Sequence, residues 1–481
     1  MDLVCLRSLS LSDIEIAGRR ARAELNVKTA QGKQYSFVLQ LAYERPLPSH
    51  CLPVLRLAFC MPLLNYGLFT HKIFLDFSLG EGDTVLLQQL NQIFSRDIFV
   101  NKILRRRAPY ILPQFLHHED SIHPGDSSPQ AAIVPRAVLP TTPLDGQVTA
   151  DSCGVLSSGG KESLLTYGFL KEISDNIHPL YVNESGGHWR TALPAYKYHR
   201  EHEPRTCRVW SNVDRFYNFM LDILEFIRPD HRKIKADTYP LRLCIFPFYV
   251  FALLPIFMER HIGNLLIGSE FDDPRTNNYF QGIPHYFGVY DQHQDYDDLM
   301  NHWYSQRIPG MTQWSALRTI SGFMVEKILV NSYPHLAQLQ RSCHSCFIKK
   351  GAVFPCGACS KCLGVILFLL GNNTDPHFLH YPKKEGTYWL SLLKKVALRL
   401  DEDEKNHALY LLGQAASISL GAYHPHIESI HLHKDTCDIK KIPPYFRKRI
   451  LTILNQYTQG YTHLAKDTWV FSKCRTMPDL G

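Results

Sequence analysis

A short polar segment after an apolar strand carries the clearest chemical signal in the sequence. Residues 154–165 read GVLSSGGKESLL, which predicts a strand that ends at Leu156 and a helix that starts at Ser163. A helix N-terminus presents unpaired N–H groups and the positive end of the helix dipole, and adjacent glycines let an anion approach the main chain. Ser158, Lys161 and Ser163 add two hydroxyl groups and a cation. The segment therefore predicts a phosphate-binding loop.

The spacing of this loop excludes two common nucleotide-binding motifs. It is neither the Gly-x-x-x-x-Gly-Lys-Ser/Thr loop of nucleoside triphosphatases nor the Gly-x-Gly-x-x-Gly fingerprint of dinucleotide-binding domains. The alternative to a phosphate site is an ordinary glycine-rich turn between a strand and a helix.

Two further polar segments carry candidate chemistry. Residues 267–273 read IGSEFDD and place three carboxylates within four residues after a predicted strand. Glu270 and Asp272 could hold magnesium, which prefers oxygen ligands, or contact a substrate; a solvated acidic loop is the alternative. Further along, His293 or Asp295 could act as an acid or a base, although both stand at a predicted helix start where such residues often serve as caps.

A cluster of five cysteines between residues 343 and 362 predicts a metal site. The first two have two residues between them, nine residues follow, and the last three are again separated by two residues each. Such spacing lets four thiolates share one zinc ion in a closed structural site. The expected ligands are Cys346, Cys356, Cys359 and Cys362, with Cys343 as the substitute for Cys346. An iron–sulfur cluster and a set of buried free cysteines are the alternatives.

The elements that must position these residues indicate an α/β fold with a parallel sheet. After the loop, the predicted strands are 179–182, 207–210 and 265–267, and the predicted helices are 163–173, 214–227 and 241–260. Alternating strands and helices are typical of a parallel sheet that is covered on both faces. Because such sheets bind ligands at the carboxyl ends of their strands, the loop is expected at that edge.

The sequence is expected to divide into four parts. Residues 1–117 should form an α+β domain and residues 118–152, with five prolines, a linker that contains a short strand near 131–134. Residues 153–375, including the cysteine segment, should form the α/β domain, and residues 376–481 a helical carboxy-terminal region. Helices are expected at 55–66, 86–104, 388–400 and 444–457, and a β-hairpin is expected around Gln31 and Gly32.

The composition indicates an ordinary globular protein in a reducing compartment. The 481 residues are 45% hydrophobic and 20% charged, and the net charge of +7 permits anionic ligands without favouring nucleic acid. The amino terminus lacks the pattern of a secretory signal. The longest apolar run, 243–258, contains two prolines and is shorter than the about 20 residues that a spanning helix needs. A cytoplasmic location without a membrane segment is therefore expected.

The loop resembles the pyrophosphate loop, Ser-Gly-Gly-x-Asp-Ser, of the N-type ATP pyrophosphatase (PP-loop) superfamily. Residues 158–163 match this motif with Glu162 where the family usually has Asp. In that superfamily the loop holds the β- and γ-phosphates of ATP while AMP is attached to a substrate oxygen and pyrophosphate leaves. The resemblance implies that residues 153–375 form a PP-loop domain with an adenine-nucleotide α-hydrolase-like fold.

The same resemblance implies roles for the candidate residues. The phosphates of ATP would be held by Ser158, Gly159, Gly160, Lys161 and Ser163. Lys161 and Glu162 would be the catalytic residues. Lys161 would stabilise the charge that develops in the transition state. Magnesium would be supported by Glu162, Glu270 and Asp272.

Two families within the superfamily are similar over a longer stretch. The loop followed by the cysteine cluster is similar to the 7-cyano-7-deazaguanine synthase group, which is shorter and binds one zinc. The amino-terminal domain, the loop and a Cys-x2-Cys pair before an apolar helix resemble the ATP-dependent UDP-N-acetylmuramoyl-L-alanyl-L-glutamate epimerase family. The substrate segment of that family is matched only loosely at 290–294, and the stretch 239–251 differs from it.

The sequence therefore predicts an enzyme that adenylates a carboxylate or carbonyl oxygen of a small-molecule substrate and releases pyrophosphate. The second step would be epimerisation or attack by ammonia. Two alternatives remain open. One is a non-catalytic nucleotide-binding or assembly protein on a decayed PP-loop fold, and the other is a tRNA base-modifying enzyme, which would need a strongly basic surface.

Overall fold

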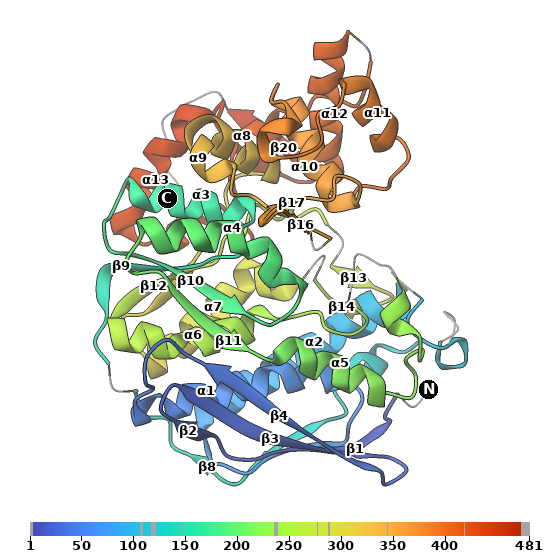
Figure 1. Ribbon diagram of the computed structural model, residues 1–481, viewed down its shortest axis with the longest axis vertical. Helices are drawn as coiled ribbons and strands as arrows, with labels where there is room; N and C mark the ends of the chain where they lie inside the picture. The colour runs from blue at the N-terminus through green and yellow to red at the C-terminus, as the bar shows by residue number, and fades with distance from the viewer. Residues whose placement is uncertain are drawn as a thin grey trace.

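A central sheet of 11 strands, with helices on both faces, organises the molecule (Figure 1). The computed structural model describes residues 3–105, 109–116, 122–144, 146–234, 239–276, 278–286, 289–343, 345–417 and 419–472. The prediction of an α/β protein with a largely parallel sheet is confirmed.

Five parallel strands form one half of this sheet. They are β9 (Thr149–Leu156), β10 (Ile177–Asn183), β11 (Cys207–Ser211), β12 (Ile262–Leu266) and β15 (Thr312–Trp314). Their order across the sheet is β15-β12-β9-β10-β11, and every neighbouring pair is parallel. The chain thus builds outward from β9 on one side and then returns to build on its other side. In doubly wound sheets, the reversal of strand order marks the place where ligands bind.

Burial on both faces explains why these strands are almost continuously apolar. All five residues of β12 are buried. Leu265 packs into one hydrophobic core and its neighbour Leu266 into the other. Leu180 and Tyr181 of β10 divide between the two cores in the same way, because successive side chains of a strand point to opposite faces. The sheet therefore separates two large apolar cores.

The other half of the sheet comes mainly from the amino-terminal part of the chain. It contains β1 (Leu6–Leu11), β2 (Glu15–Ala17), β3 (Arg20–Thr29), β4 (Gln34–Ala42), β5 (Lys72–Leu75) and β7 (Ala132–Pro135). The predicted hairpin is confirmed, since β3 and β4 pair antiparallel and β3 alternates exposed and buried residues. The short strand predicted near 131–134 is β7, which pairs with β5.

The two halves meet where β11 pairs antiparallel with β4. Trp210 lies opposite Ala42 and Ser211 opposite Leu41. One sheet therefore crosses the boundary that the sequence suggested at residue 117. The division into four parts remains a prediction, and the structure adds that the first and third parts share their central sheet (Figure 1).

The helices fall into two groups according to the core they bury. One core includes residues of α1 (Leu52–Cys60), α2 (Glu81–Ile98), α5 (Val213–Ile223), α6 (Phe246–Arg260) and α7 (Gln294–Arg307). The other includes residues of α3 (Lys161–Lys171), α4 (Gly187–His202), α8 (Gly322–Ser332), α9 (Pro334–Ala337), α10 (Ser360–Gly371), α11 (Gly386–Leu393), α12 (Glu402–Ala416) and α13 (Pro444–Tyr457). None of the helices in the described ranges is long and apolar enough to cross a membrane.

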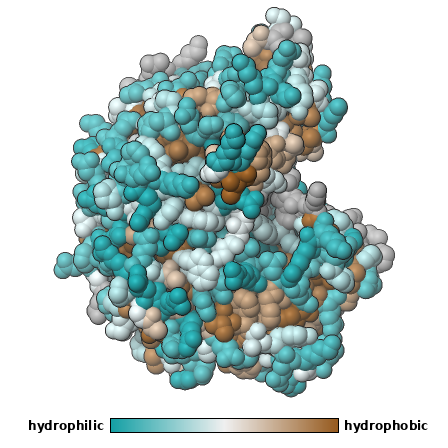
Figure 2. Space-filling view, in the orientation of Figure 1, coloured by the Kyte–Doolittle hydropathy of each residue, from teal (hydrophilic) through white to brown (hydrophobic). Residues whose placement is uncertain are grey.

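Small sheets complete the fold. β16 (Phe347–Lys349) and β17 (Ala352–Phe354) form a hairpin within the cysteine segment, and β18 (Ile430–Leu432), β19 (Tyr461–Ala465) and β20 (Thr468–Ser472) form a three-stranded sheet in the carboxy-terminal region. β13 (Tyr279–Phe280) pairs with β14 (Ile283–Pro284), and β6 (Leu79–Gly80) with β8 (Val138–Leu139). Figure 2 shows the surface hollowed at the right between the carboxy-terminal region above and β13 and β14 below.

Candidate functional site

The glycine-rich loop lies at the carboxyl end of β9, where the strand order reverses. β9 ends at Leu156 and α3 begins at Lys161, two residues before the predicted start at Ser163. Gly159 has a φ of +77°, and a Cβ placed there would lie 2.9 Å from the carbonyl oxygen of Thr191 on α4. Only glycine tolerates both the left-handed backbone and this close approach.

Hydrogen bonds within the loop hold its two serines together. The backbone N–H of Ser158 donates to Oγ of Ser163 at 3.3 Å, and the N–H of Gly160 donates to Oγ of Ser158 at 3.4 Å. No side chain caps the N-terminus of α3. The first N–H groups of this helix therefore point toward the loop, which is the arrangement that binds phosphate at helix N-termini.

Lys161 joins two carboxylates that are far apart in the sequence. Its Nζ lies 2.6 Å from Oε1 of Glu162 and forms a second ion pair with Glu270, which follows β12. The two loops can approach because Gly268 has no side chain; a Cβ there would lie 2.8 Å from Cβ of Glu162. The structure thus brings three of the predicted site residues into one cluster.

The charges within this cluster shift its pKa values. Burial would lower the pKa of Lys161, but the neighbouring charges of Glu162 and Glu270 raise it above its ordinary value. Burial raises the pKa of Glu270, and the charge of Lys161 only partly opposes this. For Glu162 the balance is reversed, since the attraction of Lys161 outweighs burial and lowers the pKa. Lys161 is therefore a permanent cation at the first turn of α3.

Asp272 has different partners from Glu270. Its Oδ2 lies 3.5 Å from Nδ1 of His293 and 3.6 Å from the guanidinium of Arg318. Burial raises the pKa of Asp272, while His293 and Arg318 act in the opposite direction. The structure therefore pairs a predicted carboxylate with one of the two acid or base candidates. The other candidate, Asp295, is exposed in the first turn of α7, where its carboxylate accepts a hydrogen bond from the hydroxyl of Tyr286 at 2.6 Å.

The cysteine cluster forms as predicted with one substitution. The sulfur atoms of four cysteines lie within 4.8 Å of one another, and these are Cys343, Cys356, Cys359 and Cys362. Cys343 takes the place predicted for Cys346. The physical reason is a tight turn in which the N–H of Cys346 bonds to the carbonyl of Cys343, so that Cys346 leads into β16. Cys346 stays adjacent, in hydrogen-bond contact with Cys343.

The four cysteines fit a zinc ion. The Sγ atoms of Cys356 and Cys362 are 3.7 Å apart, close to the about 3.8 Å between two ligands of a tetrahedral zinc with bonds of about 2.3 Å. The N–H of Cys362 also donates to Sγ of Cys359, which caps α10. The start of that helix thus stabilises negative charge on the sulfur.

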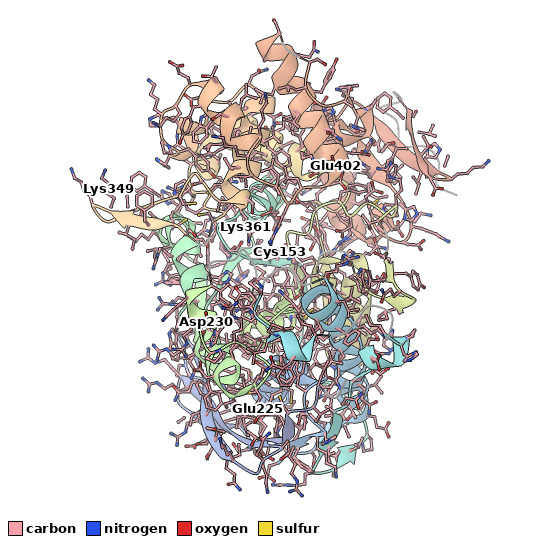
Figure 3. All side chains as sticks on the ribbon, turned by 90° about the vertical axis from the view of Figure 1, so that its right-hand side faces the viewer. Cys153, Glu225, Asp230, Lys349, Lys361 and Glu402 are labelled. Carbon is pink, nitrogen blue, oxygen red and sulfur yellow. The ribbon has the colours of Figure 1, made fainter. Side chains whose placement is uncertain are left out.

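A direct link between the loop and the residues just before the cysteine segment was not predictable from local patterns. The N–H of Arg341 donates to the carbonyl of Gly159 at 2.9 Å. Burial raises the pKa of Glu162 and lowers that of His188. The nearest cations, Lys161 and Arg242, lower these two pKa values in turn, and the charge of Lys361, between two of the cysteines, adds a smaller effect in the same direction. In Figure 3, Lys361 lies between the carboxy-terminal helices above and the central sheet below. Its place in the motif Cys-Ser-Lys-Cys was the only available signal.

A buried ionic network follows β10 on the other side of the loop. Tyr249 donates its hydroxyl to Oε2 of Glu184 at 2.5 Å, and Arg242 lies 3.3 Å from the same oxygen. The guanidinium of Arg242 stacks over Tyr239 and contacts His188. These residues belong mostly to the stretch 239–251, and sequence patterns did not identify them because the contacts with Glu184 and His188 each span more than 50 residues.

Comparison with protein-family models, with curated proteins and with solved structures finds no match. The site itself must carry the functional argument.

Proposed function

We propose that this protein is an ATP-dependent enzyme that attaches AMP to a carboxylate or carbonyl oxygen of a small molecule and releases pyrophosphate. The observation that carries the proposal is the position of the loop. It combines two glycines, two hydroxyls and Lys161 at the start of α3, next to the point where the strand order reverses. Its likeness to the PP-loop motif, with Glu162 in place of Asp, supports the same assignment.

In this proposal the chain positions the phosphates for an in-line displacement. The N–H groups at the start of α3, with Ser158 and Ser163, bind the β- and γ-phosphates. The substrate oxygen attacks the α-phosphorus and forms the new P–O bond. The bond from the α-phosphorus to its bridging oxygen breaks, and pyrophosphate leaves with the electron pair. Lys161 stabilises the negative charge that develops on the leaving group.

Magnesium fits the acidic half of the cluster. Glu162 and Glu270 would hold it, and the ion would supply further neutralisation of the phosphate charge. Both carboxylates now face the same ammonium group. A bound triphosphate would add several negative charges beside them, so a divalent cation would offset the repulsion.

The second step would use groups on the neighbouring strand ends. His293 and Asp272 form a partly buried pair that could accept a proton from the activated substrate. This role would suit epimerisation next to an activated carboxylate, whereas attack by ammonia would need only an open path to it. The zinc site would be structural, because four thiolates complete its coordination and hold the segment that contacts Gly159.

Exchange of labelled pyrophosphate into ATP tests this proposal. Adenylation is reversible, so exchange should require both magnesium and the correct substrate from a panel that includes a muramyl dipeptide nucleotide and a deazapurine carboxylate. Lys161→Ala should slow the exchange about 10²- to 10³-fold. Lys171→Ala is the matched control, since Lys171 ends the same helix and pairs with Glu203. It should retain the wild-type rate.

Three outcomes would contradict the proposal. Equal exchange rates in Lys161→Ala and Lys171→Ala would show that Lys161 takes no part in the reaction. Formation of ADP in place of exchange would place the cleavage at a different phosphorus. ATP binding without exchange for any member of the panel would instead support a non-catalytic nucleotide-binding protein.

A further inference from the structure

Three potential metal ligands meet in the carboxy-terminal region, apart from the cysteine cluster. Asp403 lies in the first turn of α12, and His424 and His426 stand on either side of Pro425 at the start of the 3-10 helix η10 (Pro425–Glu428). One ligand atom from each lies within 4.8 Å of the others. Figure 3 labels Glu402, the residue before Asp403, in the upper part of the molecule.

The distances among these atoms suit a shared ion. Nε2 of His426 is 3.3 Å from Oδ2 of Asp403, and Nδ1 of His424 is 3.5 Å from Oδ1 of the same carboxylate. Ligands of a tetrahedral ion with bonds of 2.0–2.1 Å are separated by about 3.3 Å. The two imidazole rings are nearly perpendicular, at 84°, with centroids 5.8 Å apart. Both rings can therefore present a nitrogen to the same point without stacking on each other.

The side chain of His426 in this group is buried. The side chain of His426 is 6% exposed, and its Nε2 has no hydrogen-bond partner among the described residues. A buried polar atom that lacks a partner costs free energy, and a bound cation would remove this cost.

Neighbouring side chains fix the orientation of the ligands. The ring of Trp469 stacks on His426 at an interplanar angle of 16°. Arg275 contacts Oδ2 of Asp403 at 2.5 Å and also pairs with Asp273. Ligating carboxylates commonly have such outer hydrogen-bond partners. Two carboxylates and one guanidinium leave a net charge of −1 at this cluster, so electrostatics favour a divalent cation.

We propose that Asp403, His424 and His426 bind a divalent transition-metal ion, zinc or iron(II), as a second metal site. Two imidazole nitrogens and one carboxylate oxygen select these ions over magnesium and calcium, which take oxygen ligands. The site is independent of the nucleotide reaction proposed above. It joins α12 and η10 to the loop after β12, because Arg275 and Asp273 belong to that loop. The ion would therefore hold the carboxy-terminal region against the loop after β12, which also carries Glu270.

Metal analysis of the full-length protein tests the site. Samples produced in zinc-supplemented and in iron-supplemented medium would be dialysed, and both metals would be quantified per chain. We expect His426→Ala and His424→Gln each to bind about one metal ion per chain fewer than the wild type. Cys359→Ser, which disrupts the cysteine cluster, should retain that ion. His463→Ala is the matched control, since His463 is exposed on β19 and should not change the metal content. The metal that disappears identifies the ion.

Cobalt substitution gives a second readout that does not depend on metal content alone. Cobalt at the cysteine cluster should show intense sulfur-to-metal charge transfer, while the histidine site should show only weaker d–d bands. Cys359→Ser should abolish the first signal and preserve the second, and His424→Gln should do the reverse. Because His424 is partly exposed, its replacement should leave the fold intact even if His426→Ala does not. Unchanged metal content and cobalt bands in His424→Gln would overturn the proposal.

Discussion

At the scale of single residues, Gly159 shows how one backbone conformation can determine the site. Its left-handed φ and its approach to Thr191 leave no room for a side chain. Replacement by alanine should cost about 1–2 kcal/mol for the left-handed backbone, and the clash with the Thr191 carbonyl should add to it. We expect Gly159→Ala to lower the melting temperature and to weaken ATP binding more than tenfold.

Gly351 provides the matched control for this variant. It has a φ of +78°, almost the same as Gly159, but a Cβ there would meet no atom within 4 Å. Gly351→Ala should therefore carry only the conformational cost and leave ATP binding unchanged. Calorimetric titration of ATP with both variants separates the two effects. Equal affinities in the two variants would show that the loop does not contact the nucleotide.

Residue types predicted the members of the site better than their partners. The hydroxyls, glycines and lysine of the loop form a recognisable local pattern, and the carboxylates after β12 could be named because they follow a strand. The pairing of Lys161 with Glu270 joins residues 109 positions apart. Lys361 could not be identified, because its influence on Glu162 depends on contacts between segments that are far apart in the sequence.

At the scale of elements, the group of four sulfur atoms includes Cys343 and not Cys346. We expect Cys343→Ser to lose zinc at this site and Cys346→Ser to keep it, because only the first residue belongs to the group of four sulfurs. Zinc content per chain, measured with the histidine site disabled by His424→Gln, gives the comparison. Retention of zinc by Cys343→Ser together with loss by Cys346→Ser would reverse the assignment.

Removal of zinc should also affect the loop. Arg341 donates its N–H to Gly159 only two residues before Cys343, so disorder in the cysteine segment should weaken that hydrogen bond. In the chelated protein we expect lower affinity for ATP. If added zinc, but not added magnesium, restores the affinity for ATP, the loss of zinc is the cause of the weaker binding.

The elements themselves follow mostly from local periodicity. The alternation of polar and apolar residues in β3 and the apolar spacing of α13 each reflect one buried face, which a single segment displays. No local pattern of polar and apolar residues marks the pairing of β4 with β11. It joins residues about 170 positions apart through backbone hydrogen bonds, which are insensitive to side-chain type. For this reason the sequence suggested separate domains where the structure has a common sheet.

At the scale of the whole molecule, buried histidines should make the protein sensitive to acid. Burial lowers the pKa of His178 and of His199 from 6.5 to about 3 in the folded state. The unfolded chain therefore binds these protons first as the pH falls. Above pH 6.5 these histidines are neutral in both states and do not change the free energy of unfolding with pH. Between pH 6.5 and about 3, each lowers the free energy of unfolding by about 1.4 kcal/mol per pH unit.

Melting temperatures at pH 7.5, 6 and 5 check this expectation. The wild type should lose stability between pH 6.5 and 5. His199→Gln should show a shallower decline, because one of the groups that takes up a proton on unfolding is absent. A melting temperature that stays constant across this interval, or rises, would show that burial does not lower the pKa values of these histidines in the folded state.

The two apolar cores and the sheet between them set the position of everything that the site needs. The strand reversal beside β9 places the loop, the end of β12 and the start of α4 at one edge, and Arg341, just before the cysteine segment, bonds to the loop there. Most of this arrangement rests on contacts between distant segments, so the sequence could predict the elements and the class of fold but not how the elements pair.

The most direct measurement is the identity of the nucleotide product. Wild-type protein would be incubated with magnesium and ATP labelled at the α-phosphorus, with and without each candidate substrate. We predict AMP and pyrophosphate in equal amounts, formed only when the substrate is present and formed about 10²- to 10³-fold more slowly in Lys161→Ala. ADP and inorganic phosphate as the products would contradict the proposal that the loop from Ser158 to Ser163 positions ATP for adenylation.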